Sequence, residues 1–334
     1  MPTRAMPTLL LLVLCAPLQA EPADWQRPVA TYSIVARDSS TGELGVAVQS
    51  HWFSVGPIVP WARAGIGAVA TQSLVDPAYG PLGLELMASG RSASQALIAL
   101  LAADADREVR QVAMIDANGD VAAHTGHLAI IAAGHSMGDQ YSVQANLMDR
   151  ETVWPAMAQA YEASTGDLAE RLLAALEAAE AEGGDVRGRQ SAALLVVSGQ
   201  DTGRPWVDRR FDLRVEDHPT PVAELRLLVQ LARAYHTLNE GDEWIPAGDM
   251  DAAMTAYSQA IELVADEATG GEAPFWVGAT LASIDRVEEA IPYLRRAQAQ
   301  HDRWADLIRR LPASGLLPDD DALIDHLVEQ MVED

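Results

Sequence analysis

The residue pattern changes once along this chain, and that change limits the available folds more than any other feature. Short apolar runs with the spacing of β-strands recur up to residue 215, mixed with a few segments of helical spacing. After His218-Pro219-Thr220-Pro221 the strand patterns stop, and the following sequence is alanine-rich with helical spacing. The sequence therefore predicts an α+β domain over 31–218 and an all-α domain over 219–334.

Strands and helices alternate in the first of these parts. Two hairpins are expected, one joining 31–38 to 43–50 and one joining 111–116 to 121–125 across Asn118-Gly119. Further strands are expected at 65–73, 191–198 and 206–215, and helices at 92–103, 151–163 and 167–181. This order favours stacked layers of helix and sheet over a helix bundle.

The second part contains a weak internal repeat. Small and large residues recur with an offset of 37 residues, as Ala253-xxx-Tyr257-xx-Ala260 and then Ala290-xxx-Leu294-xx-Ala297. Tetratricopeptide repeats have a period of about 34 residues and carry small residues where their two helices touch. The region resembles one such repeat and part of another, and a plain pair of helical hairpins is the alternative.

Charge and residue types exclude several classes of protein. The 334 residues include 48 Asp and Glu against 23 basic residues, for a net charge of −25 that disfavours binding to nucleic acid. All basic residues are arginine, so neither a Walker-A lysine nor a Schiff-base lysine is available. Cys15 is the only cysteine, which excludes a disulfide framework. No cofactor and no metal are expected.

The first twenty residues have the outline of a secretory signal peptide. One arginine precedes a short apolar run, and Leu18-Gln19-Ala20 follows it. The run from Leu9 to Leu14 is far shorter than the ~20 residues that a membrane span needs. A lipid anchor on Cys15 is disfavoured by the bulky Leu14 before it. The sequence predicts a signal peptide over 1–20, a short segment over 21–30, and a periplasmic or secreted protein without a membrane span.

Several stretches of the first domain carry a family resemblance. They read TYSIVARDSSTGELGVAV from Thr31, PWARAGIGAVATQS from Pro60, GGDVRGRQSAALLVV from Gly183 and DHPTPVAEL from Asp217. Together they resemble the family called domain of unknown function 1028, over roughly 31–225. That family is grouped with the N-terminal-nucleophile (Ntn) hydrolases. The resemblance therefore implies a four-layer αββα fold for the first domain.

The resemblance also implies a catalytic residue. The matching strand of the family opens the domain, which makes Thr31 the nucleophile, with its own α-amine as the base. Asn146 or Gln72 would supply a side-chain amide to an oxyanion. Because residues 21–30 precede Thr31, a second cleavage between Ala30 and Thr31 is required. Without it, Thr31 is only a β-branched residue that starts a strand.

Four further residues are candidates for substrate binding. Arg187 and Arg189 lie in a dense polar run, and either guanidinium could bind a substrate carboxylate with Asp185 orienting it. A loop pinned by an Asp–Arg pair is the structural alternative. Arg63, just before the strand expected at 65–73, is a weaker candidate.

Three other motifs favour structural interpretations. Gly134-His135-Ser136-Met137-Gly138 matches the nucleophile elbow of α/β-hydrolases, and the apolar run 128–133 before it resembles a strand. The elbow must lead into a helix, whereas 141–144 resembles a strand, so a glycine-bounded hairpin turn is favoured. His124 and His127 would point to opposite faces of a strand, which disfavours a metal site with His135. The acidic run 116–120 is explained by a hairpin turn.

The sequence thus predicts an exported Ntn-type hydrolase that cleaves an amide bond of a small or peptide-like substrate through Thr31. The alternative is a catalytically inactive Ntn-like fold that binds a protein partner through residues 219–334. A serine hydrolase using Ser136 would require a helix directly after Gly138. The substrate and the oligomeric state are left open by the sequence.

Overall fold

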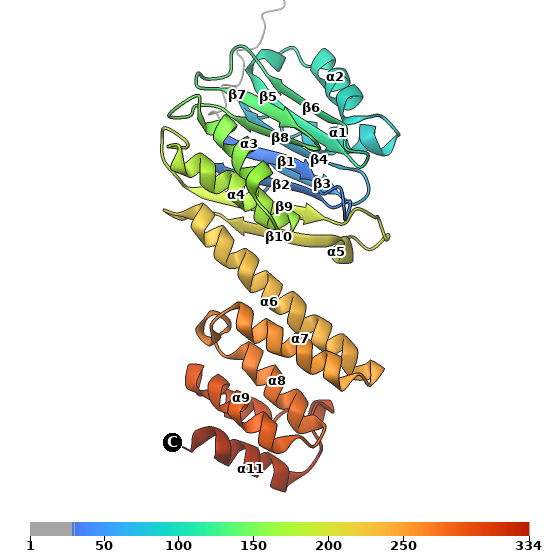
Figure 1. The fold of residues 1–334 in the computed structure, drawn as a ribbon, viewed down its shortest axis with the longest axis vertical. Coiled ribbons are helices and arrows are strands. Elements are labelled where there is room, and N and C mark those ends of the chain that lie inside the picture. Colours follow the sequence, from blue (N-terminus) through green and yellow to red (C-terminus); the bar gives the residue numbers. More distant parts are fainter. Residues whose placement is uncertain (1–28, 30, 334) are drawn as a thin grey trace, which may run out of the picture.

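Two β-sheets with flanking helices form the first part of the molecule, and a column of helices forms the second (Figure 1). The computed structural model describes Val29 and residues 31–333. The predicted signal peptide and all of the predicted segment 21–30 except Val29 lie outside the described residues. The protein is therefore of mixed α and β structure, with a helical C-terminal region.

All strand pairs in the two sheets are antiparallel. The six-stranded sheet has the order β10-β9-β2-β1-β8-β7 and the four-stranded sheet the order β3-β4-β5-β6. The bounds are β1 Thr31–Arg37, β2 Leu44–Ser50, β3 Pro60–Arg63, β4 Gly67–Ser73, β5 Arg110–Asp116, β6 Val121–Thr125, β7 Gly134–Gly138, β8 Tyr141–Ala145, β9 Ser191–Val197 and β10 Arg209–Val215.

Each sheet has helices on one face and the other sheet on the opposite face. Helices α3 (Val153–Ala163) and α4 (Leu168–Ala181) share an apolar core with the six-stranded sheet. Helices α1 (Tyr79–Ala88) and α2 (Ala93–Ala103) share another with the four-stranded sheet. A third apolar cluster joins the two sheets face to face. The short helix α5 (Pro205–Asp208) precedes β10.

One long helix connects the sheets to the helical region. Helix α6 (Pro221–Ala247) packs Val222, Leu225 and Val229 into the core of the six-stranded sheet, whereas its later residue Leu238 belongs to the helical core. The helices that follow are α7 (Met250–Leu263), α8 (Glu272–Ser283), α9 (Val287–Gln300), α10 (Trp304–Ile308) and α11 (Asp321–Val332). The two cores therefore share α6, and the change of packing falls within this helix.

Two close contacts recur within the helical region. A Cβ built on Gly241 of α6 would lie 2.4 Å from Cε1 of Tyr257 in α7, and one on Gly278 of α8 would lie 2.6 Å from Cγ of Leu294 in α9. Both contacts carry the offset of 37 residues seen in the sequence. Since glycine has no side chain, the paired helices approach closely at these points. None of the described helices is long and apolar enough to cross a membrane.

Most predicted elements in the first part have observed counterparts, and the hairpins β1–β2 and β5–β6 are both present. The strand-like run 128–133 is instead a loop, so that interpretation was wrong. The loop is held by Leu147 and Met148, whose amides donate to the carbonyls of Ile130 and Ala132 at 3.2 Å each. Ala132 has a φ of 55°, which interrupts an extended strand. Strand β3 and helix α1 were not predicted.

Candidate active site

The space between the two sheets has an apolar end and a polar end. Alternate residues of a strand face the same side, so each strand contributes every second residue to this space. At one end these residues are apolar, among them Val35, Val46, Ala68, Ala113 and Ile115. At the other end they are hydroxyls and amides, and all of the following are fully buried: Thr31, Ser33, Ser50, Gln72, Gln111, Gln144 and Asn146. The polar end is the candidate site.

Thr31 begins β1 at this polar end. Its hydroxyl donates to the carbonyl of Val29 at 2.7 Å and lies 3.2 Å from the hydroxyl of Ser50 on β2. Its own carbonyl accepts a hydrogen bond from the backbone amide of Asn146 at 3.1 Å. Thr31 is therefore held by both its side chain and its backbone.

The other two predicted catalytic residues meet at the same carbonyl. Gln72 Nε2 donates to the Thr31 oxygen at 3.1 Å, and Asn146 Nδ2 lies 3.5 Å from it. Both side-chain amides also donate to Gln111 Oε1, at 2.7 Å and 2.9 Å. Gln72 Oε1 in turn accepts from the Ser33 hydroxyl at 2.6 Å. The fold thus brings Thr31, Gln72 and Asn146 together in one hydrogen-bonded cluster.

Four members of this cluster were missed from the sequence, namely Ser33, Ser50, Gln111 and Gln144. Gln144 Nε2 donates to Ser33, which extends the cluster across β8. A signal was present, because Ser142, Gln144 and Asn146 are polar at every second position of a buried strand. Polar residues with period two at positions that should be apolar are a sequence sign of a functional interior.

A second group of predicted residues borders the site. Asp185, buried to 5% exposure, accepts hydrogen bonds from Arg187 Nε at 3.1 Å and Nη2 at 2.8 Å. Its Oδ2 also accepts from the backbone amide of His51, which follows Ser50 at the end of β2. The Asp185–Arg187 pair therefore lies next to the strand end that carries Ser50 and faces Thr31.

The two other predicted arginines lie away from the cluster. Arg189 pairs with Glu180 at 3.4 Å, and its side chain is 45% exposed. Arg63 pairs with Glu85 at 3.3 Å and lies opposite Gly67, at the far end of β4 from Gln72. The structure groups Asp185 and Arg187 with Thr31 and separates Arg63 from them.

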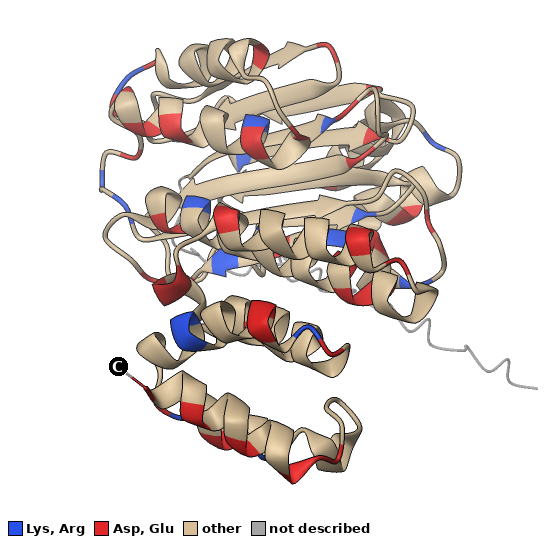
Figure 2. Ribbon diagram, turned by 60° about the horizontal axis from the view of Figure 1, so that its bottom comes forward, with Lys and Arg blue, Asp and Glu red and all other residues tan. Residues whose placement is uncertain are grey.

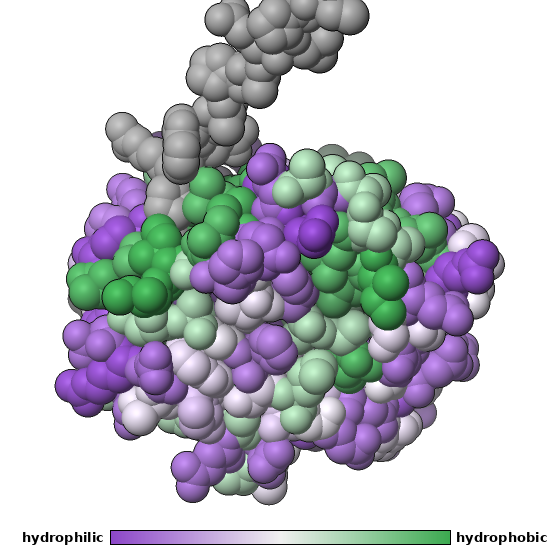
Figure 3. All heavy atoms as spheres, turned by 90° about the horizontal axis from the view of Figure 1, so that it is seen from above, coloured by the Kyte–Doolittle hydropathy of each residue, from purple (hydrophilic) through white to green (hydrophobic). Residues whose placement is uncertain are grey.

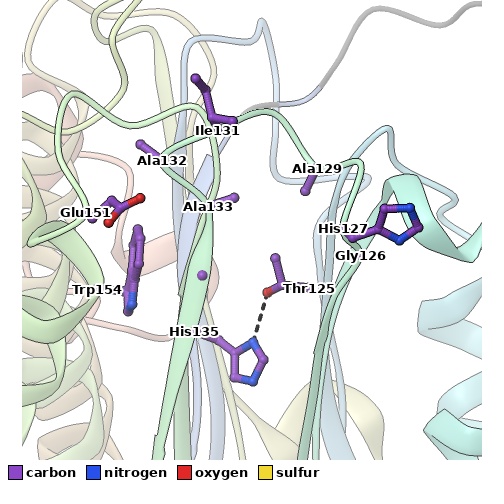
Figure 4. Close-up of a pocket in the computed structure, with 11 residues that line it drawn as sticks. Thr125, Gly126, His127, Ala129, Ile131, Ala132, Ala133, His135, Glu151 and Trp154 are labelled. Atoms are coloured by element: carbon purple, nitrogen blue, oxygen red, sulfur yellow. Dashed lines mark hydrogen bonds between the residues drawn. The ribbon is translucent and has the colours of Figure 1, made fainter.

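A cavity of about 470 Å³ adjoins the cluster on the side of Gln111 (Figure 4). Gln111 Nε2 donates to Thr125 Oγ1 at 2.9 Å, and the same hydroxyl lies 2.9 Å from Nδ1 of His135. Figure 4 shows Thr125 facing Trp154 and Glu151 across the cavity. Burial, together with the nearby His124, lowers the pKa of His135 and favours its neutral form. The volume is within the range of small-molecule sites.

The structure also shows the surroundings of His124, His127 and Ser136, which the sequence offered as alternative site residues. His124 contacts the carbonyl of Arg107 at 2.8 Å and His127 contacts Glu108 at 2.6 Å. Strand β8 follows Gly138 after a two-residue turn, so the serine-hydrolase elbow on Ser136 is excluded. The favoured hairpin is present, although Gly134–Gly138 is itself strand β7 and the turn follows it.

Charge is distributed mainly outside this site. Figure 2 shows Asp, Glu and Arg largely on helices and loops, with the central strands mostly uncharged. The groups around Thr31 are accordingly amides and hydroxyls. Figure 3 shows separate apolar areas on one outer face, and the loop beside the cavity exposes Leu128 and Ile131, at 59% and 86%.

This sheet architecture is shared with known relatives. A family model described as a family of unknown function (DUF1028) matches residues 31–225, and the chain belongs to this family. The crystal structure of protein SPO2555 from Silicibacter pomeroyi, matched to the same family, is 31% identical to this chain. The similarity covers 61% of this chain and 89% of that one, with a TM-score of 0.54. None of the curated proteins matches.

Proposed function

We propose that this chain is an exported Ntn-type hydrolase that cleaves an amide bond of a small or peptide-like substrate with Thr31 as its nucleophile. One observation carries the proposal. The Thr31 hydroxyl is buried at the polar end of the space between the sheets, and its contacts are the Val29 carbonyl and the Ser50 hydroxyl. Neither contact is a base at neutral pH, whereas a freed α-amine of Thr31 would be one.

The layer order supports the same class. Helices α1 and α2, the four-stranded sheet, the six-stranded sheet, and helices α3 and α4 follow one another, as in the αββα arrangement that the Ntn resemblance implies. Membership of the DUF1028 family is consistent with it. The fold would bury Thr31 between the sheets in either case, so the chemistry of its N-terminus decides the activity.

The reaction would run in two stages after cleavage between residues 30 and 31. The Thr31 α-amine takes the hydroxyl proton as Oγ1 attacks the substrate carbonyl carbon, and the C–N bond breaks as the leaving amine accepts that proton. An ester on Thr31 remains. Water then attacks the ester, and the acid product leaves with the hydroxyl of Thr31 restored.

The hydrogen bonds of the Gln72 and Asn146 side-chain amides suggest a role other than oxyanion stabilisation. The N–H groups of Gln72 and Asn146 are directed at the Thr31 carbonyl and at Gln111 Oε1. In this arrangement they act as positioning residues that fix the nucleophile. For either amide to donate to an oxyanion, its hydrogen bond to Gln111 Oε1 would have to break. Arg187, oriented by Asp185, is the proposed partner of a substrate carboxylate.

The deciding experiment is the N-terminal mass of the protein from an exporting host, followed by an amidase screen. A chain that starts at Thr31 is expected, and a chain that retains residues 21–30 would overturn the proposal. Thr31→Ala should abolish hydrolysis and Thr31→Ser should retain it. Thr165→Ala, at an exposed threonine, is the matched control. Recovery of this chain from the periplasm or the medium, rather than from the cytoplasm, tests export.

A second candidate is a catalytically inactive domain that binds a protein through tetratricopeptide-like helices. A groove of about 610 Å³ between α6 and α8 favours it, with Leu238, Ile245 and Trp276 beside Asp242 and Glu272. The repeated Gly241–Tyr257 and Gly278–Leu294 contacts support the helical-repeat interpretation. Uncleaved protein that captures a partner, and loses it when the Trp276 side chain is removed, would favour this function.

A further inference from the structure

Strand β4 has an edge that its neighbour β3 does not cover. β3 pairs with β4 from Gly67 to Ala70, and the amide of Thr71 then donates to the carbonyl of Val59 at 3.2 Å. Ser73 lies two residues further along with a φ of 74°, and its amide and carbonyl both lie on this uncovered side. The chain before β3 turns away from β4 at this point, because the backbone amides of Ile58 and Val59 both donate to the carbonyl of Val55. The edge at Ser73 needs another partner.

Val29 is that partner in the structure. Its amide donates to the Ser73 carbonyl at 2.7 Å, and its carbonyl accepts from the Ser73 amide at 3.1 Å. This is an isolated antiparallel bridge that continues the line of β3 along β4. The Val29 carbonyl accepts the Thr31 hydroxyl as well. The backbone of Val29 thus occupies a strand-like position beside β4.

The Val29 side chain is also enclosed. It is 0% exposed and belongs to the apolar cluster between the sheets, together with Val55, Val59 and Val75. Val29 is the second residue on the acyl side of the bond between residues 30 and 31. Cleavage of that bond and departure of the segment would leave the Ser73 amide and carbonyl unpaired and an apolar site open. Leaving a buried polar group unpaired is unfavourable, so a ligand that restores these two hydrogen bonds is favoured.

We propose that the position of Val29 is a substrate subsite. The substrate is an extended peptide or peptide-like amide that adds as a strand to β4, as in β-augmentation. Its second residue before the cleaved bond exchanges two backbone hydrogen bonds with Ser73 and puts a valine-sized apolar side chain where Val29 now lies. This subsite rests on the proposed hydrolase function and narrows its substrate class.

Four probe peptides test the subsite. The parent is acetyl-Arg-Pro-Val-Ala-aminomethylcoumarin, which copies residues 27–30. One variant carries N-methylvaline and so lacks the N–H that would bind the Ser73 carbonyl. Another replaces valine with aspartate, and the control replaces arginine with glutamine. The protein is the chain from Thr31 to Asp334, made behind a leader that a scarless protease removes after folding.

We expect kcat/KM about 10-fold lower for the N-methylvaline and aspartate peptides, and unchanged within about 2-fold for the control, since tenfold is about 1.4 kcal/mol. Equal cleavage of all four peptides would overturn the subsite while the hydrolase stands. If no peptide is cleaved, the hydrolase proposal fails, and the subsite is judged by titrating the same chain with acetyl-Arg-Pro-Val-Ala. About 10-fold weaker binding of its N-methylvaline form would support the subsite, whereas equal or absent binding would overturn it.

Discussion

The hydroxyl of Thr31 donates a hydrogen bond to the carbonyl of Val29, two residues earlier in the chain, at 2.7 Å. The same carbonyl accepts a hydrogen bond from the Ser73 backbone amide. The Val29 carbonyl is therefore bound both by the candidate nucleophile and by the edge of β4. Val29, two residues before Thr31, therefore lies within the site.

Replacement of Val29 by aspartate should slow the release of Thr31. A carboxylate in this fully buried position is costly, so the segment would not dock against β4. The fraction of processed chain, measured by intact mass at fixed times, should fall about 10-fold or more. Val29→Ile keeps a β-branched apolar side chain and should process normally. Normal processing of the aspartate variant would contradict this role for docking.

Gln111→Leu should destabilise the first domain by about 3 kcal/mol or more. It leaves the Gln72 and Asn146 amides without their shared acceptor and frees the carbonyl of Ala145, each at about 1–3 kcal/mol. Urea denaturation would measure the change. Gln200→Leu, at an exposed site, should shift the free energy of unfolding by less than about 0.5 kcal/mol. Similar effects of both substitutions would refute a structural role for the amide cluster.

Asp185→Asn should lower stability by about 2 kcal/mol and loosen the loop that carries Arg187. The Asp185 carboxylate is buried and accepts hydrogen bonds from the Arg187 guanidinium and the His51 amide, and bonds to charged groups are worth about 1.5–3 kcal/mol. Arg189→Gln removes an ion pair of a half-exposed side chain and should cost at most about 1 kcal/mol. Thermal unfolding of both variants gives the comparison, and a larger loss for Arg189→Gln would reverse the assignment.

Gly278→Ala should destabilise the helical region although alanine favours helix by about 1 kcal/mol. The new Cβ would meet Leu294 Cγ at 2.6 Å and the Ala290 carbonyl at 3.1 Å, and overpacking of this kind costs about 1–3 kcal/mol. Glu262→Ala, on an exposed face of α7, is the control and should change stability little. A higher melting temperature for Gly278→Ala would show that the helices can separate without cost.

The stability of the protein should fall as the pH drops below about 6.5, in part through His135. Burial first, and then the charge of His124, lower the pKa of His135 in the folded state. The unfolded chain therefore binds a proton at higher pH than the folded chain, which favours unfolding as the pH falls. His135→Gln should remove its share of this loss between pH 7.5 and 5. His326→Gln, at an exposed histidine, should leave that share intact, and an unchanged slope for His135→Gln would refute it.

Local patterns accounted for much of the secondary structure. The Asn118-Gly119 turn was readable because two residues of that type favour a tight hairpin, and Asp116 Oδ1 accepts from the Asn118 and Asp120 amides there. The alanine spacing around Tyr257 and Leu294 was readable because a helix repeats its faces within one or two turns. The loop at 128–133 could not be predicted in this way. Its apolar pattern resembles a strand, but hydrogen bonds from Leu147 and Met148 hold it as a loop.

The residue types available to the site, the position of Thr31 at the start of a strand and the change to helices after β10 could all be predicted from the sequence. Which of these residues contact one another depends on the tertiary fold. Gln72 lies on β4, Gln111 on β5 and Asn146 directly after β8, and strand order rather than local spacing brings the Gln72 and Asn146 amides to the Thr31 carbonyl and to Gln111 Oε1. Arg63 is excluded from that group by the same cause, because antiparallel pairing puts it at the other end of β4. The alternation of side chains along a strand indicates on which side of its sheet a residue lies, but not which strand of the other sheet it will contact.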